Sequence, residues 1–285
     1  MMLEEVQLQE GISNATLTAY LQEPISDSQL LQRKPAIIIC PGGAFLGFTE
    51  KETEPVALRF LSEGFQAFVL RYSIGTDFAR FPSPFIDAAK AVMSVRQNCD
   101  RWGIDPNKII LCGFSTGGQV AATLGATWRE DYLKNSLKAD SQLFKPNVLI
   151  LGYPLLDMEC FYSFNQRKSQ EMDTLLEMMF TSIYGTMFPT KQMMEKWNIV
   201  DRINVHFPST FLWTTSEDSF IDVEESMKFI KTLAAYKIPY EFHIFERGAH
   251  GMSLGTGGLT GENIKNRGNA PKWFELAMHW MKDLY

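Results

Sequence analysis

The fold of this 285-residue chain can be predicted outward from one segment, Lys108-Ile109-Ile110-Leu111-Cys112-Gly113-Phe114-Ser115-Thr116-Gly117-Gly118. Residues 108–112 form a short apolar run, which is typical of a buried strand. Residues 119–126 are rich in alanine and predict a helix. Between the two segments, residues 113–117 fit Gly-x-Ser-x-Gly, the pattern of a sharp strand-to-helix turn that exposes a serine at the top of a sheet.

The glycines and the following helix give Ser115 the setting of a nucleophile. Gly113 and Gly117 leave room for a turn that larger side chains would obstruct, and such a turn strains the backbone of the serine. The N-terminus of the next helix presents free N–H groups that favour developing negative charge. A merely structural turn is the alternative, but the strand–turn–helix context favours a catalytic serine.

Apolar runs and helical segments alternate on both sides of this turn. We expect strands at residues 35–40, 65–72, 108–112, 147–154, 210–215 and 240–245, and helices at residues 53–62, 87–98, 119–126, 223–235 and 271–284. This alternation predicts an α/β protein with a mostly parallel central sheet covered by helices on both faces. Residues 6–9 and 15–21 indicate an antiparallel edge, and residues 102–107 a turn.

Residues 158–205 interrupt this rhythm and hold seven of the 14 methionines together with several phenylalanines. We interpret them as a small helical cap insertion in a single domain that covers residues 1–285. The methionines could line an apolar substrate pocket, because methionine adapts to irregular shapes, or they could pack the insertion onto the domain. The sequence leaves these two roles open.

Composition excludes several classes of function. The net charge of −6, with no basic block, argues against nucleic acid as a partner. No apolar run is long enough to span a bilayer, and the acidic N-terminus lacks the apolar core of a signal peptide. The four cysteines show no metal-ligand spacing, so we expect no metal and a reduced, cytoplasmic protein. The sequence leaves open whether the chain forms a homo-oligomer.

A nucleophilic serine needs a base, and the chain has four histidines. His250 lies on a glycine-flanked loop after a predicted strand, where its ring can reach a site. His243 lies within a predicted strand, His279 lies on the last helix, and His206 precedes a strand at the edge where we expect no chemistry. His250 is therefore the predicted base.

An acid that orients this base should follow an earlier strand, and Asp218 lies in the segment directly after the strand at 210–215. Glu217 is its close rival. Asp222 also competes, but with Glu225 three residues later it fits a helix N-cap and a capping box. Asp218 is the predicted acid.

The oxyanion of an acyl-transfer intermediate needs hydrogen-bond donors. The backbone N–H group of Thr116, next to the nucleophile, is one candidate. The other should come from the loop after the strand at 35–40, where Gly43 and Ala44 are the candidates. The alternative for this glycine pair is an ordinary tight turn.

With these residues placed, the chain from about residue 15 onward resembles the α/β-hydrolase superfamily, and within it the bacterial esterase/lipase-like branch that includes acetyl-xylan and other carbohydrate acetylesterases. The matching motifs are Pro41-Gly42-Gly43-Ala44-Phe45, Gly103 to Ile109 ahead of Gly113 to Gly118, Trp213 to Asp218, and Glu241 to Phe245 ahead of Gly248 to Gly251. The chain order of serine, aspartate and histidine also agrees with this superfamily. The sequence departs from the branch at Ala44, Gln119 and Asp222, where a glycine, a histidine and a proline are common.

The resemblance implies an α/β-hydrolase fold and a serine carboxylesterase that acts on small esters without a cofactor. O-acetylated sugars enter as substrates by analogy with the branch alone. An amidase or aryl-formamidase with the same three residues is one alternative, and a non-catalytic binding module of the same fold is another.

Overall fold

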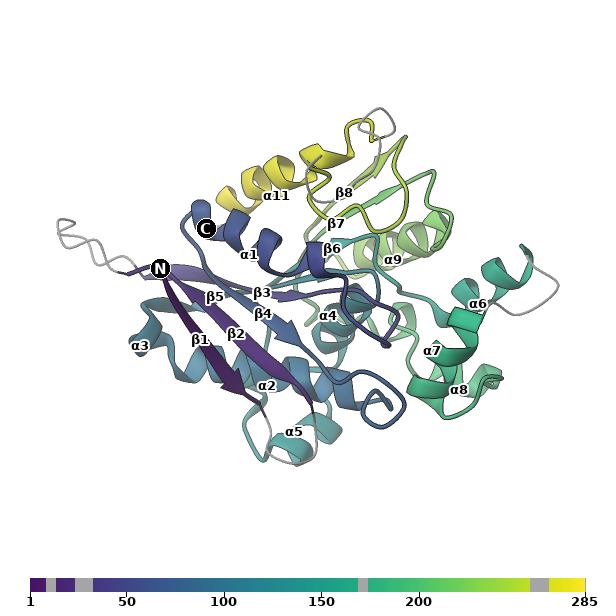
Figure 1. The fold of residues 1–285 in the computed structure, drawn as a ribbon, viewed down its shortest axis with the longest axis horizontal. Coiled ribbons are helices and arrows are strands. Elements are labelled where there is room, and N and C mark those ends of the chain that lie inside the picture. The colour runs from purple at the N-terminus through teal and green to yellow at the C-terminus, as the bar shows by residue number, and fades with distance from the viewer. Residues whose placement is uncertain (9–13, 24–32, 169–173, 257–266, 285) are drawn as a thin grey trace.

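The structure, a computed structural model, describes residues 1–8, 14–23, 33–168, 174–256 and 267–284. The described part is built on one eight-stranded sheet with the order β1-β2-β4-β3-β5-β6-β7-β8 (Figure 1). Every neighbouring pair from β4 to β8 is parallel, whereas β2 pairs antiparallel with both β1 and β4. The strands are β1 (Met2–Gln7), β2 (Thr16–Leu21), β3 (Lys34–Cys40), β4 (Gln66–Arg71), β5 (Ile104–Phe114), β6 (Val148–Gly152), β7 (Ser209–Thr215) and β8 (Tyr240–Phe245).

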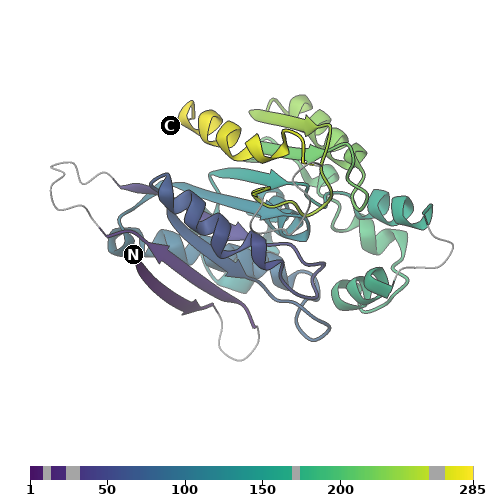
Figure 2. The same ribbon diagram turned by 45° about the horizontal axis from the view of Figure 1, so that its top comes forward.

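Helices cover both faces of the sheet (Figure 1, Figure 2). One face carries α1 and α11, whose Phe60 and Phe274 rings lie 4.8 Å apart between centroids. The other face carries α2, α4 and α9. The α-helices are α1 (Glu54–Ser62), α2 (Ser83–Gln97), α3 (Cys99–Trp102), α4 (Thr116–Thr127), α5 (Asp131–Leu137), α6 (Met158–Gln166), α7 (Thr174–Tyr184), α8 (Lys191–Glu195), α9 (Val223–Ala235) and α11 (Trp273–Lys282).

Alternation along the central strands divides the core in two. In β3, Ile37 and Ile39 join the cluster under α1 and α11, while Ile38 joins the cluster under α2 and α4. All three side chains are fully buried, and full burial of such a side chain stabilises the fold by about 1.5–3 kcal/mol relative to exposure. The predicted mostly parallel sheet with an antiparallel edge and helices on both faces is confirmed.

Several predicted boundaries were wrong. The edge strand expected at residues 6–9 is β1, which runs from Met2 to Gln7, and residue 9 lies outside the described residues. The predicted turn at 102–107 is strand from Ile104 onward, because Ile104 pairs with Lys34 before an irregularity in the register. The helix predicted from Asp87 begins at Ser83. A proline, Pro84, occupies its first turn, where the missing N–H group costs no hydrogen bond.

The segment 158–205 forms α6, α7, α8 and a short 3-10 turn, η3 (Val200–Arg202), and its residues 169–173 lie outside the described residues. These helices lie at one end of the molecule, next to α9 (Figure 1). Met158, Met179 and Phe180 are fully buried in the same cluster as the sheet, so packing accounts for them. The domain organisation and the cap role of this segment stay predictions.

No helix in the described ranges has the length and apolar character needed to cross a membrane.

Candidate active site

Ser115 lies between β5 and α4 in the backbone conformation that the Gly-x-Ser-x-Gly turn predicts. Its φ is 52° and its ψ is −122°, a region that side chains adopt only under strain. Neighbouring backbone atoms leave no room for a Cβ atom at Gly113 or Gly117. A Cβ atom on Gly113 would lie 2.3 Å from the Gly117 carbonyl oxygen, and one on Gly117 would lie 2.0 Å from the Cys40 carbonyl oxygen. The turn therefore sets Ser115 directly against the end of β3.

The structure brings the three predicted residues together at the carboxyl edge of the parallel strands. The His250 Nε2 atom lies 2.9 Å from the Ser115 Oγ atom, and the His250 Nδ1 atom lies 2.8 Å from the Asp218 Oδ2 atom. Asp218 follows β7 and His250 follows β8. This arrangement lets an imidazole take the serine proton while a carboxylate holds the ring in the required tautomer.

The carboxylate of Asp218 is fixed on both oxygens. Its Oδ1 atom accepts hydrogen bonds from the N–H groups of Phe220 (2.8 Å) and Ile221 (2.9 Å), which leaves Oδ2 for His250. Phe220 also packs on the His250 ring, with centroids 5.1 Å apart. The rival Glu217 accepts a hydrogen bond from the Gly248 N–H group, and so supports the histidine loop instead.

Asp222 caps α9 as predicted, because its side chain accepts a hydrogen bond from the Glu224 N–H group. The predicted capping box was wrong in its second half. Glu225 does not turn back to Asp222; its Oε2 atom accepts hydrogen bonds from the N–H groups of Leu156 and Asp157. Burial raises the pKa of Glu225 well above its ordinary value. The fold thus uses Glu225 to hold the loop after β6.

The predicted oxyanion loop lies against Ser115. A Cβ atom on Gly42 would be 2.8 Å from the Ser115 Cβ atom. Gly43 and Ala44 both have positive φ, at 139° and 56°. Among the described residues, no hydrogen bond uses the backbone N–H groups of Gly43, Ala44 or Thr116, so all three donors remain for a ligand.

The other histidines lie elsewhere. The His243 Nε2 atom is 2.7 Å from the Glu241 Oε1 atom, and its ring stacks on Phe245. His206 is exposed before β7, and His279 is exposed on α11. Of the four histidines, His250 alone contacts Ser115.

Two residues that no sequence motif indicated, Tyr153 and Glu52, support the His250 side of this site. The ring of Tyr153, at the end of β6, meets the His250 ring edge-on with centroids 5.0 Å apart. Its hydroxyl group donates a 2.6 Å hydrogen bond to the buried carboxyl group of Glu52. These two residues are 101 positions apart in the chain, so no local pattern in the sequence joins them.

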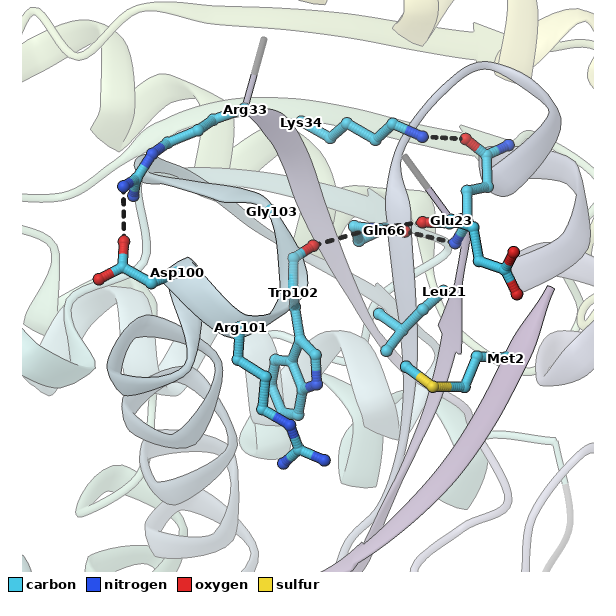
Figure 3. A pocket seen from close by; sticks show the side chains of 11 residues that line it. Met2, Leu21, Glu23, Arg33, Lys34, Gln66, Asp100, Arg101, Trp102 and Gly103 are labelled. Carbon is cyan, nitrogen blue, oxygen red and sulfur yellow. Dashed lines mark hydrogen bonds and ion pairs between the residues drawn. The ribbon is translucent and has the colours of Figure 1, made fainter. Parts of the chain in front are cut away.

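A cavity of about 430 Å³ lies at the opposite edge, where β3, β4 and β5 begin (Figure 3). Its lining includes Lys34, Gln66 and Trp102, and contains no serine, threonine, cysteine or histidine. It therefore lacks a serine, threonine or cysteine nucleophile and an imidazole base. Within the described ranges, no group of three or more histidine, cysteine, aspartate or glutamate side chains could hold a metal ion.

A family model, BD-FAE, matches residues 25–233, a span that contains Ser115 and Asp218 and ends before His250. The chain is 28% identical over 224 residues to endo-1,4-beta-xylanase B of Butyrivibrio fibrisolvens, covering 78% of this chain and 33% of the xylanase. It is 24% identical over 231 residues to esterase LipC of Mycobacterium tuberculosis, covering 80% of this chain and 55% of LipC. The chain thus spans about a third and about half of the lengths of these two relatives.

A solved structure, the acetyl ester-xyloside bifunctional hydrolase of Caldicellulosiruptor lactoaceticus, is 27% identical to the chain with a TM-score of 0.76. The match covers 99% of this chain and 96% of that one. The fold is the α/β-hydrolase fold, as the sequence motifs predict.

Proposed function

Because the chain belongs to the BD-FAE family, we propose that it is a serine carboxylesterase that hydrolyses small esters through an acyl-enzyme. The observation that carries this proposal is the 2.9 Å approach of the His250 Nε2 atom to the Ser115 Oγ atom, with Asp218 on the far side of the ring. A serine hydroxyl group is a weak nucleophile at neutral pH, and this arrangement supplies the base that it needs.

In the proposed reaction, Ser115 Oγ attacks the acyl carbon of the ester while His250 takes the serine proton. His250 then gives this proton to the oxygen of the leaving alcohol, and the acyl group stays on Ser115. Water attacks the acyl-enzyme with the same base, which releases the acid and restores the serine. Asp218 keeps the imidazole in the tautomer that carries its proton on Nδ1.

The negative oxygen of each tetrahedral intermediate would receive hydrogen bonds from the N–H groups of Thr116 and of Gly43 or Ala44. These groups have no acceptor among the described residues, and the loop that carries Gly43 lies against Ser115. The first helical turn of α4 adds a favourable dipole. One such donor contributes about 3–4 kcal/mol to transition-state stabilisation.

We propose acetylated sugars as the substrate class. The support comes from a relative described as an acetyl ester-xyloside hydrolase and from another described as a xylanase. We also propose a cytoplasmic location, because all four cysteines are free thiols and three of them are buried in the core.

The test compares acetate esters with the matching acetamides, using wild type and Ser115→Ala. We expect ester turnover by wild type, and a loss of about 10⁴-fold or more in kcat for Ser115→Ala with unchanged folding. Ser219→Ala, an exposed serine beside Asp218, is the matched control and should retain activity. Near wild-type turnover by Ser115→Ala would refute the proposal, and faster cleavage of the acetamide would favour the amidase alternative.

A further inference from the structure

Glu52 is a buried carboxyl group in the 3-10 turn η1 (Glu50–Glu52) that precedes α1, and the proposed reaction does not use it. It is 1% exposed. Its Oε2 atom accepts a 2.7 Å hydrogen bond from the Gly42 N–H group, and its Oε1 atom accepts a 2.6 Å hydrogen bond from the Tyr153 hydroxyl group. Each carboxyl oxygen therefore has one defined partner, and the two partners come from different loops.

Burying a carboxyl group is costly unless hydrogen bonds compensate. Burial raises the pKa of Glu52, whereas the hydrogen bonds from Tyr153 and Gly42 and the nearby His250 lower it. Burial also raises the pKa of Tyr153 well above its ordinary value, so this hydroxyl group keeps its proton and acts as the donor. A buried carboxyl group at the carboxyl edge of the sheet costs folding free energy. We therefore expect Glu52 to have a role beyond packing.

The Oε2 atom of Glu52 contacts the oxyanion loop. Gly42 directly precedes Gly43 and Ala44, whose backbone has positive φ, and its carbonyl oxygen accepts a hydrogen bond from the Thr49 N–H group. A non-glycine residue held in this conformation costs about 1–3 kcal/mol and persists only where its surroundings fix it. The bond from Gly42 to Glu52 is one of the contacts that fix it.

The Oε1 atom of Glu52 is linked to the histidine loop through Tyr153. The Tyr153 hydroxyl oxygen accepts a 2.8 Å hydrogen bond from the N–H group of Ser253, three residues after His250. The Ser253 hydroxyl group in turn donates to the carbonyl oxygen of Lys51, the neighbour of Glu52. The ring of Tyr153 also lies against the His250 ring. Glu52 thus joins the loop that carries the oxyanion donors to the loop that carries the base.

We propose that Glu52 is a positioning residue. Through its hydrogen bonds with Gly42 and Tyr153, it holds the oxyanion loop and the His250 loop in their positions around Ser115. This inference rests on the proposed function. The Glu52 side chain bonds to Gly42 and Tyr153 and not to Ser115 or His250, so it sets where the donors and the base stand when charge develops on the substrate. A displacement of about 1 Å in such groups costs about 100-fold in rate.

The first experiment uses Glu52→Gln. A glutamine has one acceptor oxygen and one NH₂ group, so it can accept a hydrogen bond from the Gly42 N–H group or from the Tyr153 hydroxyl group but not from both. We expect kcat for an acetate ester to fall about 10- to 100-fold, with KM within about twofold, because the lost contacts matter most in the transition state. Each kcat is calculated per active site, counted by titration with a fluorophosphonate, so that misfolded protein does not enter the value.

A trifluoromethyl ketone gives a second readout, because it forms a tetrahedral adduct with an activated serine. Its inhibition constant should rise in Glu52→Gln by about the same factor as kcat falls. Glu50→Gln is the matched control. Glu50 lies in the same turn, its side chain is 68% exposed, and it pairs with Arg71, so kcat should stay within about twofold of wild type.

Tyr153→Phe removes only the hydroxyl group that links Glu52 to Ser253. We expect kcat to fall about 10-fold, and the loss in the double variant Glu52→Gln/Tyr153→Phe to be smaller than the product of the two single losses, because both remove the same link. If Glu52→Gln does not fold, Tyr153→Phe decides, since it keeps the ring packing.

A kcat within twofold of wild type in folded Glu52→Gln overturns the inference, as does a loss carried wholly by KM or a double variant whose losses simply multiply. In the event that Glu52→Gln does not fold, unchanged kcat in Tyr153→Phe overturns it. A wild type that neither hydrolyses the ester nor reacts with the fluorophosphonate refutes the proposed function itself, and the inference with it.

Discussion

The carboxyl edge and the amino edge of the parallel sheet differ in how their polar side chains are partnered. At the carboxyl edge, Ser115, Asp218 and Glu52 are nearly fully buried, and each makes hydrogen bonds that fix its orientation. At the amino edge, beside the cavity of Figure 3, Arg33 pairs with Asp100 while their side chains are 50% and 88% exposed. The three carboxyl-edge groups are held rigidly and away from water, whereas this ion pair at the amino edge is solvated.

The backbone differs in the same way. Non-glycine residues with positive φ gather at the carboxyl edge, at Ala44, Phe45, Ser115, Tyr153 and Ser253. Strain of this kind persists only where many contacts impose it, and it gathers where a protein needs unusual geometry. A cavity by itself therefore does not identify a reactive site, whereas buried polar groups on a strained backbone do.

Among substitutions at the carboxyl edge, Asp218→Asn should reduce activity most. The N–H groups of Phe220 and Ile221 need an acceptor at Oδ1, so the new NH₂ group faces His250. It would then impose the wrong imidazole tautomer, and kcat should fall about 10⁴-fold with little change in stability. Steady-state kinetics and thermal unfolding measure the two quantities. Glu217→Gln, next to it, should lose far less, and equal losses would mean that the acid is misassigned.

Gly43→Ala should have the next largest effect. Its φ is 139°, and an added Cβ atom would lie 2.2 Å from the Gly47 carbonyl oxygen, so the oxyanion loop must move. We expect kcat/KM to fall about 10²- to 10³-fold. Gly47→Ala is the matched control, because its Cβ atom would meet nothing within 4 Å and should leave kcat/KM nearly unchanged. A fully active Gly43→Ala would show that this loop supplies no essential donor.

Buried carboxyl groups at the carboxyl edge should also make stability depend on pH. Burial raises the pKa of Glu225 in the folded state, so the folded protein binds its proton more tightly than the unfolded chain does. This contribution is complete below the unfolded pKa of about 4.3 and is lost as pH rises through the raised folded pKa, by up to about 1.4 kcal/mol per pH unit inside that window.

Glu225→Gln removes this titration. Its free energy of unfolding relative to wild type should therefore increase as pH rises above about 5, measured by urea unfolding at several pH values. A difference between Glu225→Gln and wild type that stays constant with pH would contradict the prediction.

The smallest effect is expected at the amino edge. Arg33→Ala removes an exposed ion pair beside the cavity, which contributes about 0–1 kcal/mol to stability. Activity on an acetate ester should stay within about twofold of wild type. A tenfold loss of kcat/KM would contradict this distinction between the two edges, because it would make the amino edge part of the reaction.

The sequence predicts the sheet and the Ser115 turn because local rules govern both. Continuous β-branched runs such as residues 35–40 form strands buried on both faces, and Gly113 has no room for a Cβ atom because it lies against Gly117 of the same turn. His250 and Asp218 could be identified because residues that follow parallel strands meet at one edge of the sheet.

Other features depend on contacts between distant segments, and the sequence does not predict them. Glu52 is buried because Tyr153, 101 positions away, gives it a donor. Glu225 resembles half of a capping box, yet the loop after β6 offers it two N–H groups. The start of β5 at Ile104 depends on pairing with Lys34, which lies in another segment of the chain.

Reaction with a fluorophosphonate probe, read by intact mass and peptide mapping, tests whether His250 activates Ser115 as a nucleophile. We expect one adduct per folded chain, on Ser115. We also expect the adduct to be lost on heat denaturation and in His250→Ala, while His206→Ala, a histidine exposed before β7, reacts as wild type does. No adduct on folded protein, an adduct on another residue, or undiminished labelling in His250→Ala would contradict this role of Ser115 and His250.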